Sequence, residues 1–554
     1  MDIKEAVIQG IRTAMDKAVA AGKLPEGDYP DIVLEIPPQK EFGDFATNIA
    51  MQSARTAHCA PRHIAESIVE ELKAPWLDKA EVAGAGFINI FLDSRVFYQV
   101  LQHILTVQEG YGTCAERPED TVQVEFVSAN PTGPLHVGHG RGAAYGSSLV
   151  NLLRMAGYKV EAEYYINDAG KQMDNLAASV NARYLELFGR KAEIPENGYH
   201  GQDIIDTAKA IAAQDGDRYL QVSEAERLAI FKDRAYEEKL KALQKDLARF
   251  HVQYDHWFSE RTLHPQGIRQ ACDALRERGK VYEKDGALWL QSTVYGDDKD
   301  RVVIRENGEP TYLAADIAYH KNKYDRHFKT MINIWGADHH GYVARVRAAM
   351  AALGYDTKRL EVLLLQMVSL FRDGKPVKMS KRTGQAITLN ELIEEVGTDA
   401  ARYFFIMRSL DTQLDFDLDL AMSHSNENPV YYIQYAHARI YSIYRQAEEA
   451  GIALPQRWEA VQWDLLQEEA ELALIKKMAA FPEEIQRAAA ARAPHRIAHF
   501  VYETAGLFHA FYNHCRIIQE DRELAIARLG LVTAVRFTIA NSLAVLGISA
   551  PQQM

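Results

Sequence analysis

The stretch from residue 121 to residue 166 limits the possible folds more than any other part of the chain. Its first segment, TVQVEFVS (121–128), alternates apolar and polar side chains as a half-buried strand does. A Pro- and Gly-rich loop follows, then a helical pattern through about 143–157 and a second strand-like run, YKVEAEYYI (158–166). A strand–helix–strand crossover of this length predicts a parallel, Rossmann-like sheet whose ligands bind at the carboxyl ends of its strands.

The other patterns divide the chain of 554 residues into three predicted domains. Residues 1–115 mix helical and strand patterns, which is typical of a small α+β domain. We expect the Rossmann-like parallel-sheet domain over 116–410, with charged helical patterns at about 170–280 forming a helical insertion. From 425 to 554 the pattern is helical, which predicts a separate all-α helix bundle. The predicted fold class is therefore multidomain α/β.

The composition limits the partners of the chain. The 76 acidic residues outnumber the 63 lysines and arginines, and a net charge of −13 weighs against a general nucleic-acid coat, so any polyanion must be held by local patches. No apolar run is long enough to predict a membrane span, and charges interrupt the N-terminal segment as they would not in a signal peptide. The four cysteines are scattered singly, which predicts no structural zinc and favours a reducing cytoplasm.

Residues 136–139, His-Val-Gly-His, lie in the loop between the predicted strand and helix. Their spacing puts His136 and His139 on one side of a first helical turn, beside the unpaired amides and positive dipole of the helix start. Glycines such as Gly138 let a phosphate-bearing ligand approach the backbone closely. Taken alone, a His-x-x-His pair is more often structural, and a metal site would need further ligands that the sequence does not offer nearby.

A second polar segment, GKPVKMSKRTG (374–384), follows a strand-like apolar run. It carries several cations between two glycines, among them Lys378 and Lys381. A basic, glycine-flanked loop is most often a solvated turn. After a strand of an open α/β sheet, however, it lies where a phosphate-contacting loop is expected.

The two segments together resemble the HIGH and KMSKS signatures of class I aminoacyl-tRNA synthetases. The longer string VEFVSANPTGPLHVGHGRG (124–142) is similar to arginyl-tRNA synthetases of bacterial type. Further similar strings lie along the chain, including YYINDAGKQM (164–173), TYLAADIAYH (311–320) and WGADHHGYVARV (335–346). The resemblance implies ATP-dependent ligation of L-arginine to its cognate tRNA through an arginyl-adenylate, with release of AMP and pyrophosphate.

For ATP, the resemblance implies a site built from both signatures, with Mg²⁺ accompanying the nucleotide. In amino acid activation a carboxylate attacks the α-phosphorus and pyrophosphate leaves, so preorganised donors and cations stabilise the transition state without an enzyme nucleophile. Arg382 stands where the family signature has serine. The catalytic positions correspond to His136, His139, Lys378 and Lys381, and the ATP-binding positions to His136, Gly138, His139, Lys378, Met379, Ser380 and Lys381.

For arginine, the substrate guanidinium offers five donors in a fixed plane and needs a carboxylate. Tyr312 and Asp316 are four residues apart, so a helix puts them on one face. Without the resemblance, such a pair would be an ordinary feature of an amphipathic helix. Glu125 is a secondary candidate for the same site. The resemblance implies that the residues that bind arginine are Ser128, Asn130, His139, Tyr312, Asp316 and Asp338.

The expected macromolecular partner is tRNA(Arg), and no membrane is expected. The chain has no lysine after Lys477, so all its later basic residues are arginines. An arginine side chain can bind a phosphate through two N–H groups at once and can stack on a base. Tyrosines within 431–444 add stacking surfaces, although tyrosines at these spacings more often pack a bundle core. The resemblance implies that the helical domain binds the anticodon, that the first domain contacts the outer corner of the tRNA, and that the enzyme is a monomer.

Two other functions fit parts of the sequence. A catalytically silent, synthetase-like RNA-binding protein would lose its phosphate-contacting groups, whereas both histidines and both lysines are present. A Rossmann-type nucleotidyltransferase for a small metabolite would not need the large helical C-terminal domain.

Overall fold

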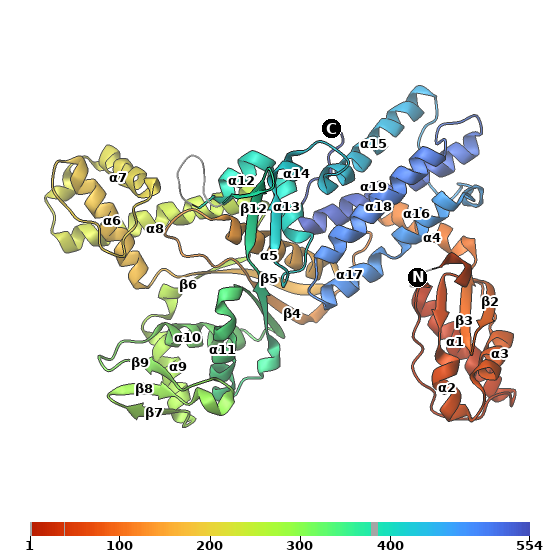
Figure 1. Cartoon of the computed structure of the whole chain (residues 1–554), viewed down its shortest axis with the longest axis horizontal. Helices are drawn as coiled ribbons and strands as arrows, with labels where there is room; N and C mark the ends of the chain where they lie inside the picture. Colours follow the sequence, from red (N-terminus) through yellow and green to blue (C-terminus); the bar gives the residue numbers. More distant parts are fainter. Residues whose placement is uncertain (1–2, 38, 378–385) are drawn as a thin grey trace. The chain divides into compact units, whose positions relative to one another are not determined.

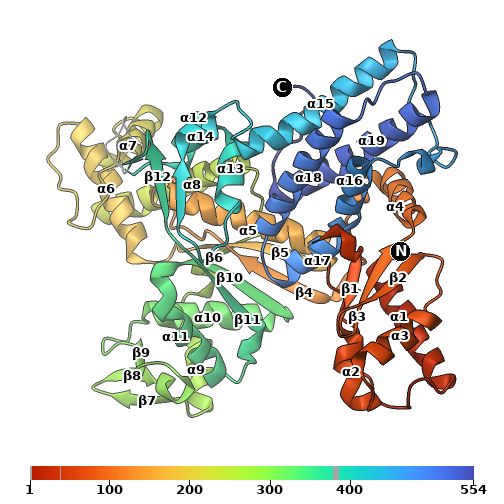
Figure 2. The same cartoon turned by 45° about the vertical axis from the view of Figure 1, so that its right-hand side comes forward.

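Figures 1 and 2 show a computed structural model of the chain, which describes residues 3–37, 39–377 and 386–554. The chain forms two compact units, each assembled from separated segments. The first unit comprises Met1–Gln108, Ser442–Ala479 and Leu507–Phe537. The second unit comprises Glu109–Tyr441, Ala480–Gly506 and Thr538–Met554.

The N-terminal part of the first unit is the α+β fold that the sequence predicts. Its three-stranded antiparallel sheet has the order β1–β3–β2 and lies against helices of the same segment. The hydroxyl of Tyr98 donates to the carbonyl of Leu466 (3.0 Å), which ties the last N-terminal helix to the helical part of this unit. The elements are α1 (Ile3–Ala20), β1 (Phe45–Thr47), α2 (Ile49–Ala57), α3 (Pro61–Glu71), β2 (Leu77–Ala83), β3 (Phe87–Leu92) and α4 (Ser94–Val107).

The second unit is built on a five-stranded sheet in which every pairing is parallel. This confirms the predicted Rossmann-like architecture. The strands run in the order β11 (Leu360–Leu365), β10 (Thr330–Gly336), β4 (Arg117–Glu125), β5 (Tyr158–Ile166) and β6 (His256–Ser259).

The crossover from β4 to β5 passes through α5 (Val137–Met155), whose glycines allow close packing on the sheet. A Cβ on Gly146 would lie 2.2 Å from the ring of Phe126, so only glycine fits at this contact. Likewise, a Cβ on Gly140 would lie 2.8 Å from Leu389. Gly140 therefore allows close packing of this helix against Leu389.

A buried arginine anchors the first turns of α5. The guanidinium of Arg141 donates to the carbonyls of Gln366 (2.8 Å), Ser409 (2.8 Å) and Thr412 (2.9 Å). Burial lowers its pKa to about 10, which leaves it charged at neutral pH. Gln366 directly follows the strand that ends at Leu365, whereas Ser409 and Thr412 lie in the loop between residues 406 and 414, so Arg141 joins the helix start to both loops.

The predicted helical insertion at about 170–280 is helical as far as Arg249 and again near its end, with a strand between the two parts. An aromatic cluster of Tyr184, Tyr219 and Phe231 fills the space between its helices. Within the same stretch, β6 adds the outer strand to the parallel sheet, because its aromatic residues pack on β5. The insertion helices are α6 (Lys171–Leu187), α7 (Gln202–Asp215) and α8 (Glu224–Arg249), followed by α9 (Gln266–Glu277).

The next segment forms a small antiparallel sheet and then returns to the parallel sheet. Its elements are β7 (Val281–Lys284), β8 (Ala287–Leu290), β9 (Arg301–Ile304), α10 (Tyr312–Asp325) and α11 (His340–Ala352). After β11 come β12 (Val368–Arg372), β13 (Lys375–Val377), α12 (Leu389–Val396), α13 (Thr398–Ile406), β14 (Leu414–Asp417) and α14 (Leu418–Met422).

The chain beyond residue 425 is helical, as predicted, and contributes to both units. Its helices are α15 (Pro429–Glu449), α16 (Glu469–Ala479), α17 (Phe481–Ala490), α18 (His495–His514) and α19 (Arg522–Leu546). The sequence predicts no membrane span, but among the described residues α19, and no other helix, is long and apolar enough to form one. However, 83% of its apolar window is buried inside the protein, as in the core helix of a bundle.

Candidate functional site

The predicted site residues gather where the parallel strands end. Ser128 follows β4, and His136 caps the helix that leaves this strand. Asp338 follows the neighbouring strand β10, and Asp316 lies in the first half of α10, the helix that precedes β10. Because the carboxyl ends of neighbouring parallel strands share one edge, residues distant in sequence meet there.

His136 and His139 form a reciprocal cap at the start of α5. Nδ1 of His136 accepts from the N–H of Gly138 (3.1 Å), and Nδ1 of His139 accepts from the N–H of His136 (3.2 Å). The two rings stack with centroids 3.6 Å apart. Burial lowers the pKa of both, and that of His139 falls to about 4 with a contribution from His136. Since Nδ1 accepts in each neutral ring, the proton is on Nε2, and the pair presents two N–H donors.

Ser128 lies in a strained turn directly after β4. Val127 has a φ of 69° and Ser128 a φ of 43°, a region that β-branched residues rarely adopt. The hydroxyl of Ser128 donates to Oε1 of Glu125 (2.9 Å) and accepts from the N–H of Tyr165 (3.2 Å). Both β4 and β5 therefore hold this hydroxyl in place.

Asp316 is partly buried on α10, and its carboxylate accepts a hydrogen bond from the phenol of Tyr342 on α11. Burial raises the pKa of Asp316 to about 7, and the nearby acids Glu260 and Glu125 add to the rise. The hydrogen bond from Tyr342 and the charge of Arg345 oppose it. Among the described residues, no cation lies within ion-pair distance of this carboxylate.

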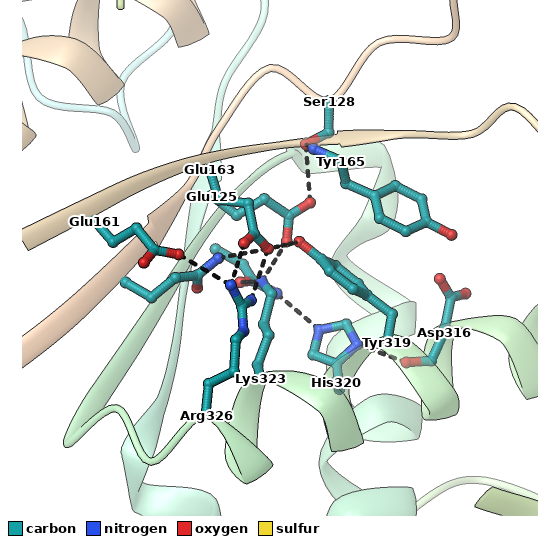
Figure 3. Close-up of polar contacts among 12 residues, drawn as sticks. Glu125, Ser128, Glu161, Glu163, Tyr165, Asp316, Tyr319, His320, Lys323 and Arg326 are labelled. Carbon is teal, nitrogen blue, oxygen red and sulfur yellow. Dashed lines mark hydrogen bonds and ion pairs between the residues drawn. The ribbon is translucent and has the colours of Figure 1, made fainter. Parts of the chain in front are cut away.

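A chain of buried hydrogen bonds connects Asp316 to two neighbouring strands of the sheet, β10 and β4 (Figure 3). The ammonium of Lys323 donates to Glu125 on β4 and to Oδ1 of Asn333 on β10 (2.7 Å). Nδ2 of Asn333 donates to Nε2 of His320 (2.9 Å), and Nδ1 of His320 donates to the carbonyl of Asp316 (2.8 Å). Burial lowers the pKa of His320 to about 3, so its ring is neutral.

A second buried acid lies beside this chain, on β5 (Figure 3). Glu163 accepts from the hydroxyl of Tyr319 (2.6 Å), from Gln123 (3.0 Å) and from the guanidinium of Arg326. The acids of β4 and β5 are therefore each paired with a cation from the α10 region. In contrast to Asp316, their charges are already compensated.

Three other predicted residues lie near this edge without a contact that identifies a role. Tyr312 is the first residue of α10 and is 57% exposed. Asp338 is exposed, and Nε2 of His339 lies 3.6 Å from its Oδ2. Asn130 is partly buried, and its carbonyl accepts from the N–H of Thr132 (2.8 Å).

The predicted phosphate-contacting residues of the second signature lie outside the described residues: Lys378, Met379, Ser380 and Lys381, together with Arg382. On their N-terminal side, the described chain ends with β13. On their C-terminal side, the carbonyl of Ile387 accepts from the N–H of Val137 (3.2 Å), and the N–H of Leu389 donates to the carbonyl of Leu135 (2.7 Å). The described residues after the second signature are thus bonded to the segment that carries the first.

The sequence matches known proteins along its whole length. The arginine–tRNA ligase of Carboxydothermus hydrogenoformans is 54% identical over 97% of both chains, and that of Heliobacterium modesticaldum is 51% identical over 100% of this chain and 98% of its own. A family model for the class I tRNA synthetase (R) catalytic domain matches residues 100–409, more than half of the chain. The chain belongs to the arginyl-tRNA synthetase family. Its residues 3–92 match the arginyl tRNA synthetase N-terminal domain, and 433–554 match the DALR anticodon binding domain.

The fold is also that of an arginyl-tRNA synthetase. The solved structure of Thermus thermophilus arginyl-tRNA synthetase superposes with a TM-score of 0.74, covering 99% of this chain and 100% of that chain at 24% identity. As a member of this family, the chain is a ligase that uses ATP to join arginine to tRNA. Among the described residues of this arginyl-tRNA synthetase, no group of His, Cys, Asp or Glu side chains could hold a metal ion.

Several residues that shape the site were not predicted from the sequence. His320 and Lys323 are four and seven positions beyond Asp316, a spacing that puts all three on one face of α10 and could have revealed them. Tyr342 lies within a string that resembles other arginyl-tRNA synthetases, but nothing in its spacing connects it to Asp316. The partner of this phenol depends on how α11 packs against α10.

Proposed function

We propose that the edge formed by the ends of β4 and β10 and the start of α5 binds arginine and ATP side by side, with Asp316 recognising the guanidinium. The uncompensated, partly buried carboxylate of Asp316 carries this proposal. A guanidinium supplies the missing positive charge and two N–H donors in the plane of the carboxylate. A spherical ion such as Na⁺ or K⁺ supplies the charge but not the two coplanar N–H donors.

The other proposed arginine contacts surround this carboxylate. Tyr312 is exposed at the start of α10, where its phenol can cover the substrate side chain. The remaining polar groups follow the strand ends and suit the α-amino and α-carboxyl groups of the amino acid. They are Ser128, Asn130, His139 and Asp338.

His136, Gly138 and His139 are proposed to bind ATP at its α-phosphate. The neutral rings donate through Nε2, and the unpaired amides and dipole at the start of α5 favour an anion. Charge on the phosphate oxygens grows as the arginine carboxylate attacks, so a donor held in advance is worth roughly 3–4 kcal/mol in the transition state. The rings need no proton transfer to act in this way.

Lys378, Met379, Ser380 and Lys381 are proposed to contact the β- and γ-phosphates and the leaving pyrophosphate. We propose that Mg²⁺ arrives bound to the phosphate oxygens of ATP, since the described residues offer it no side-chain cage. The catalytic set is then His136, His139, Lys378 and Lys381.

The tRNA is proposed to contact two regions. The helical domain at 425–554 is assigned to the anticodon, supported by its match to an anticodon binding domain, and residues 1–115 to the outer corner of the tRNA. Residues 116–410 carry catalysis. We further propose that the enzyme is a cytoplasmic monomer that needs no membrane.

Two assays test this function. Total tRNA is charged with each of the twenty amino acids in turn, and arginine alone should be incorporated. Arginine-dependent ATP–pyrophosphate exchange is then measured with and without tRNA(Arg), and the family resemblance predicts exchange only with tRNA. Equal exchange in both conditions would contradict the tRNA dependence, and no exchange in either would contradict the site.

A further inference from the structure

Lys323 is a fully buried cation near the proposed arginine site, and the reaction does not use it directly. Its ammonium has three partners: Glu125, the Oδ1 of Asn333 (2.7 Å), and the ring face of Tyr319, whose centroid lies 4.6 Å away. Because a buried ion pair seldom adds stability over packed apolar side chains, stability alone is a poor explanation for this one.

Two branches of hydrogen bonds leave the Lys323 ammonium (Figure 3). The first runs through Asn333 and His320 to the carbonyl of Asp316. Lysine only donates, so Oδ1 of Asn333 must accept and Nδ2 must donate, and the neutral ring of His320 is left with its proton on Nδ1. Each member of this branch therefore has one orientation.

The second branch runs toward the loop after β4. Glu125 accepts from Lys323 on one oxygen and from the hydroxyl of Ser128 on the other (2.9 Å). The N–H of Tyr165 completes the branch at Ser128 (3.2 Å). One ammonium thus joins a residue assigned to the amino acid end of arginine and a residue assigned to its guanidinium.

We infer that Lys323 is a positioning residue that fixes the spacing between Ser128 and Asp316, and so the length of the amino acid side chain that the site accepts. This inference rests on the proposed arginine site. Polar groups bind the amino acid end and the guanidinium end of the substrate, and their hydrogen bonds tolerate little displacement. A substrate that is one methylene longer therefore cannot form both sets of hydrogen bonds. The buried chain keeps β4, β10 and α10 from adjusting to such a substrate.

Lys323→Met tests the inference, because methionine fills a similar volume without the charge. We expect the KM for arginine to rise about tenfold in ATP–pyrophosphate exchange with tRNA(Arg), while the KM for ATP changes less than about twofold. The ratio of kcat/KM for arginine to that for homoarginine, which has one more methylene, should fall at least fivefold. Equal rises in both KM values, or an unchanged ratio, would overturn the inference.

Lys321→Met is the matched control, since Lys321 lies on the same helix and forms a surface pair with Asp325 (2.7 Å). It should change neither KM nor the homoarginine ratio. If Lys323→Met does not fold, Asn333→Leu tests the inference in its place. This variant leaves the pair of Lys323 and Glu125 intact and breaks only the branch to Asp316. An unchanged homoarginine ratio in a folded Asn333→Leu enzyme would then overturn the inference.

Asp316→Asn separates this inference from the proposed site. A raised KM for arginine in Asp316→Asn, together with unaltered selectivity in Lys323→Met, would leave the site standing and refute the positioning role. If Asp316→Asn leaves the KM for arginine unchanged, the proposed site itself fails, and the inference fails with it.

Discussion

The phenol of Tyr342 donates a hydrogen bond to the carboxylate of Asp316, which joins α11 to α10 at the proposed arginine site. Burial raises the pKa of Tyr342, so the phenol keeps its proton and adds no charge. The carboxylate is thus stabilised by a neutral donor, and its charge is left for a ligand. This relationship leads to predictions about pH and about stability.

The KM for arginine should fall as the pH rises through 7. With a pKa of about 7, Asp316 is largely protonated below neutral pH in the free enzyme, and a guanidinium binds its ionised form. Each pH unit below 7 should therefore raise the KM for arginine by about tenfold, with a plateau above pH 8. Pyrophosphate exchange between pH 5.5 and 8.5 measures this; an arginine KM that does not vary with pH would contradict it.

Asp316→Asn should raise the KM for arginine far more than that for ATP. The change removes one charge-assisted pair, worth about 1.5–3 kcal/mol, or roughly 10- to 150-fold in KM, and leaves the phosphate-binding groups intact. The pH dependence of the arginine KM should disappear in the same variant. Comparable effects on both substrates would exclude Asp316 as the guanidinium partner.

The same substitution should stabilise the enzyme at high pH. The pKa of Asp316 is about 7 in the folded state, against about 3.9 for an unperturbed aspartate. The folded state holds this proton more tightly, so its contribution to stability is complete below pH 4 and is lost as the pH rises through 7. Asp316→Asn should therefore melt higher than the parent at pH 8, with a smaller difference at pH 4, in thermal unfolding without substrates.

His136→Asn should separate capping from catalysis. The asparagine oxygen can still accept from the N–H of Gly138, so the helix start is kept, but the Nε2 donor is lost. We expect kcat for exchange to fall by about 10²–10³ with little change in melting temperature. His136→Ala should lose the cap as well, at a further cost of about 1 kcal/mol of stability. Equal melting temperatures for the two variants would argue against the cap.

Gly146→Ala should destabilise the enzyme, because the added Cβ would lie 2.2 Å from the ring of Phe126. We expect a loss of about 1–3 kcal/mol in the free energy of unfolding. Gly341→Ala is the matched control, since Gly341 is also helical and has no atom within 4 Å of the added Cβ. It should be neutral or stabilising by up to about 1 kcal/mol. Chemical denaturation compares the two variants.

Binding of tRNA should be selective and strongly dependent on salt. A chain with a net charge of −13 must hold the phosphates through local cations, and each contact releases counterions. The logarithm of Kd should rise linearly with the logarithm of salt concentration, and non-cognate RNA should compete poorly. Filter binding or fluorescence titration at several salt concentrations tests both; a Kd independent of salt would contradict the prediction.

The sequence by itself determined the central strand–helix–strand unit and the helical character of the chain beyond residue 425. Alternation in TVQVEFVS and YKVEAEYYI, with the helix between them, was enough to predict a parallel sheet, because a side chain's neighbours along one strand or helix follow from its spacing. The same local rule predicted that His136 lies beside His139, which their stacked rings confirm, and that Tyr312 shares a helix face with Asp316, which stays a prediction. Family resemblance supplied the reaction that these residues serve.

Only the tertiary structure decided which charges are compensated. Lys323 pairs with Glu125, 198 positions away, and Tyr342 on α11 donates to Asp316 on α10. No spacing in the sequence predicts either contact. The strained turn at Val127 and Ser128 also ended β4 at Glu125, earlier than the alternation suggested. Burial sets the cost of a charge and packing sets its partner, so the acid left for the substrate becomes evident only when the strands and helices have come together.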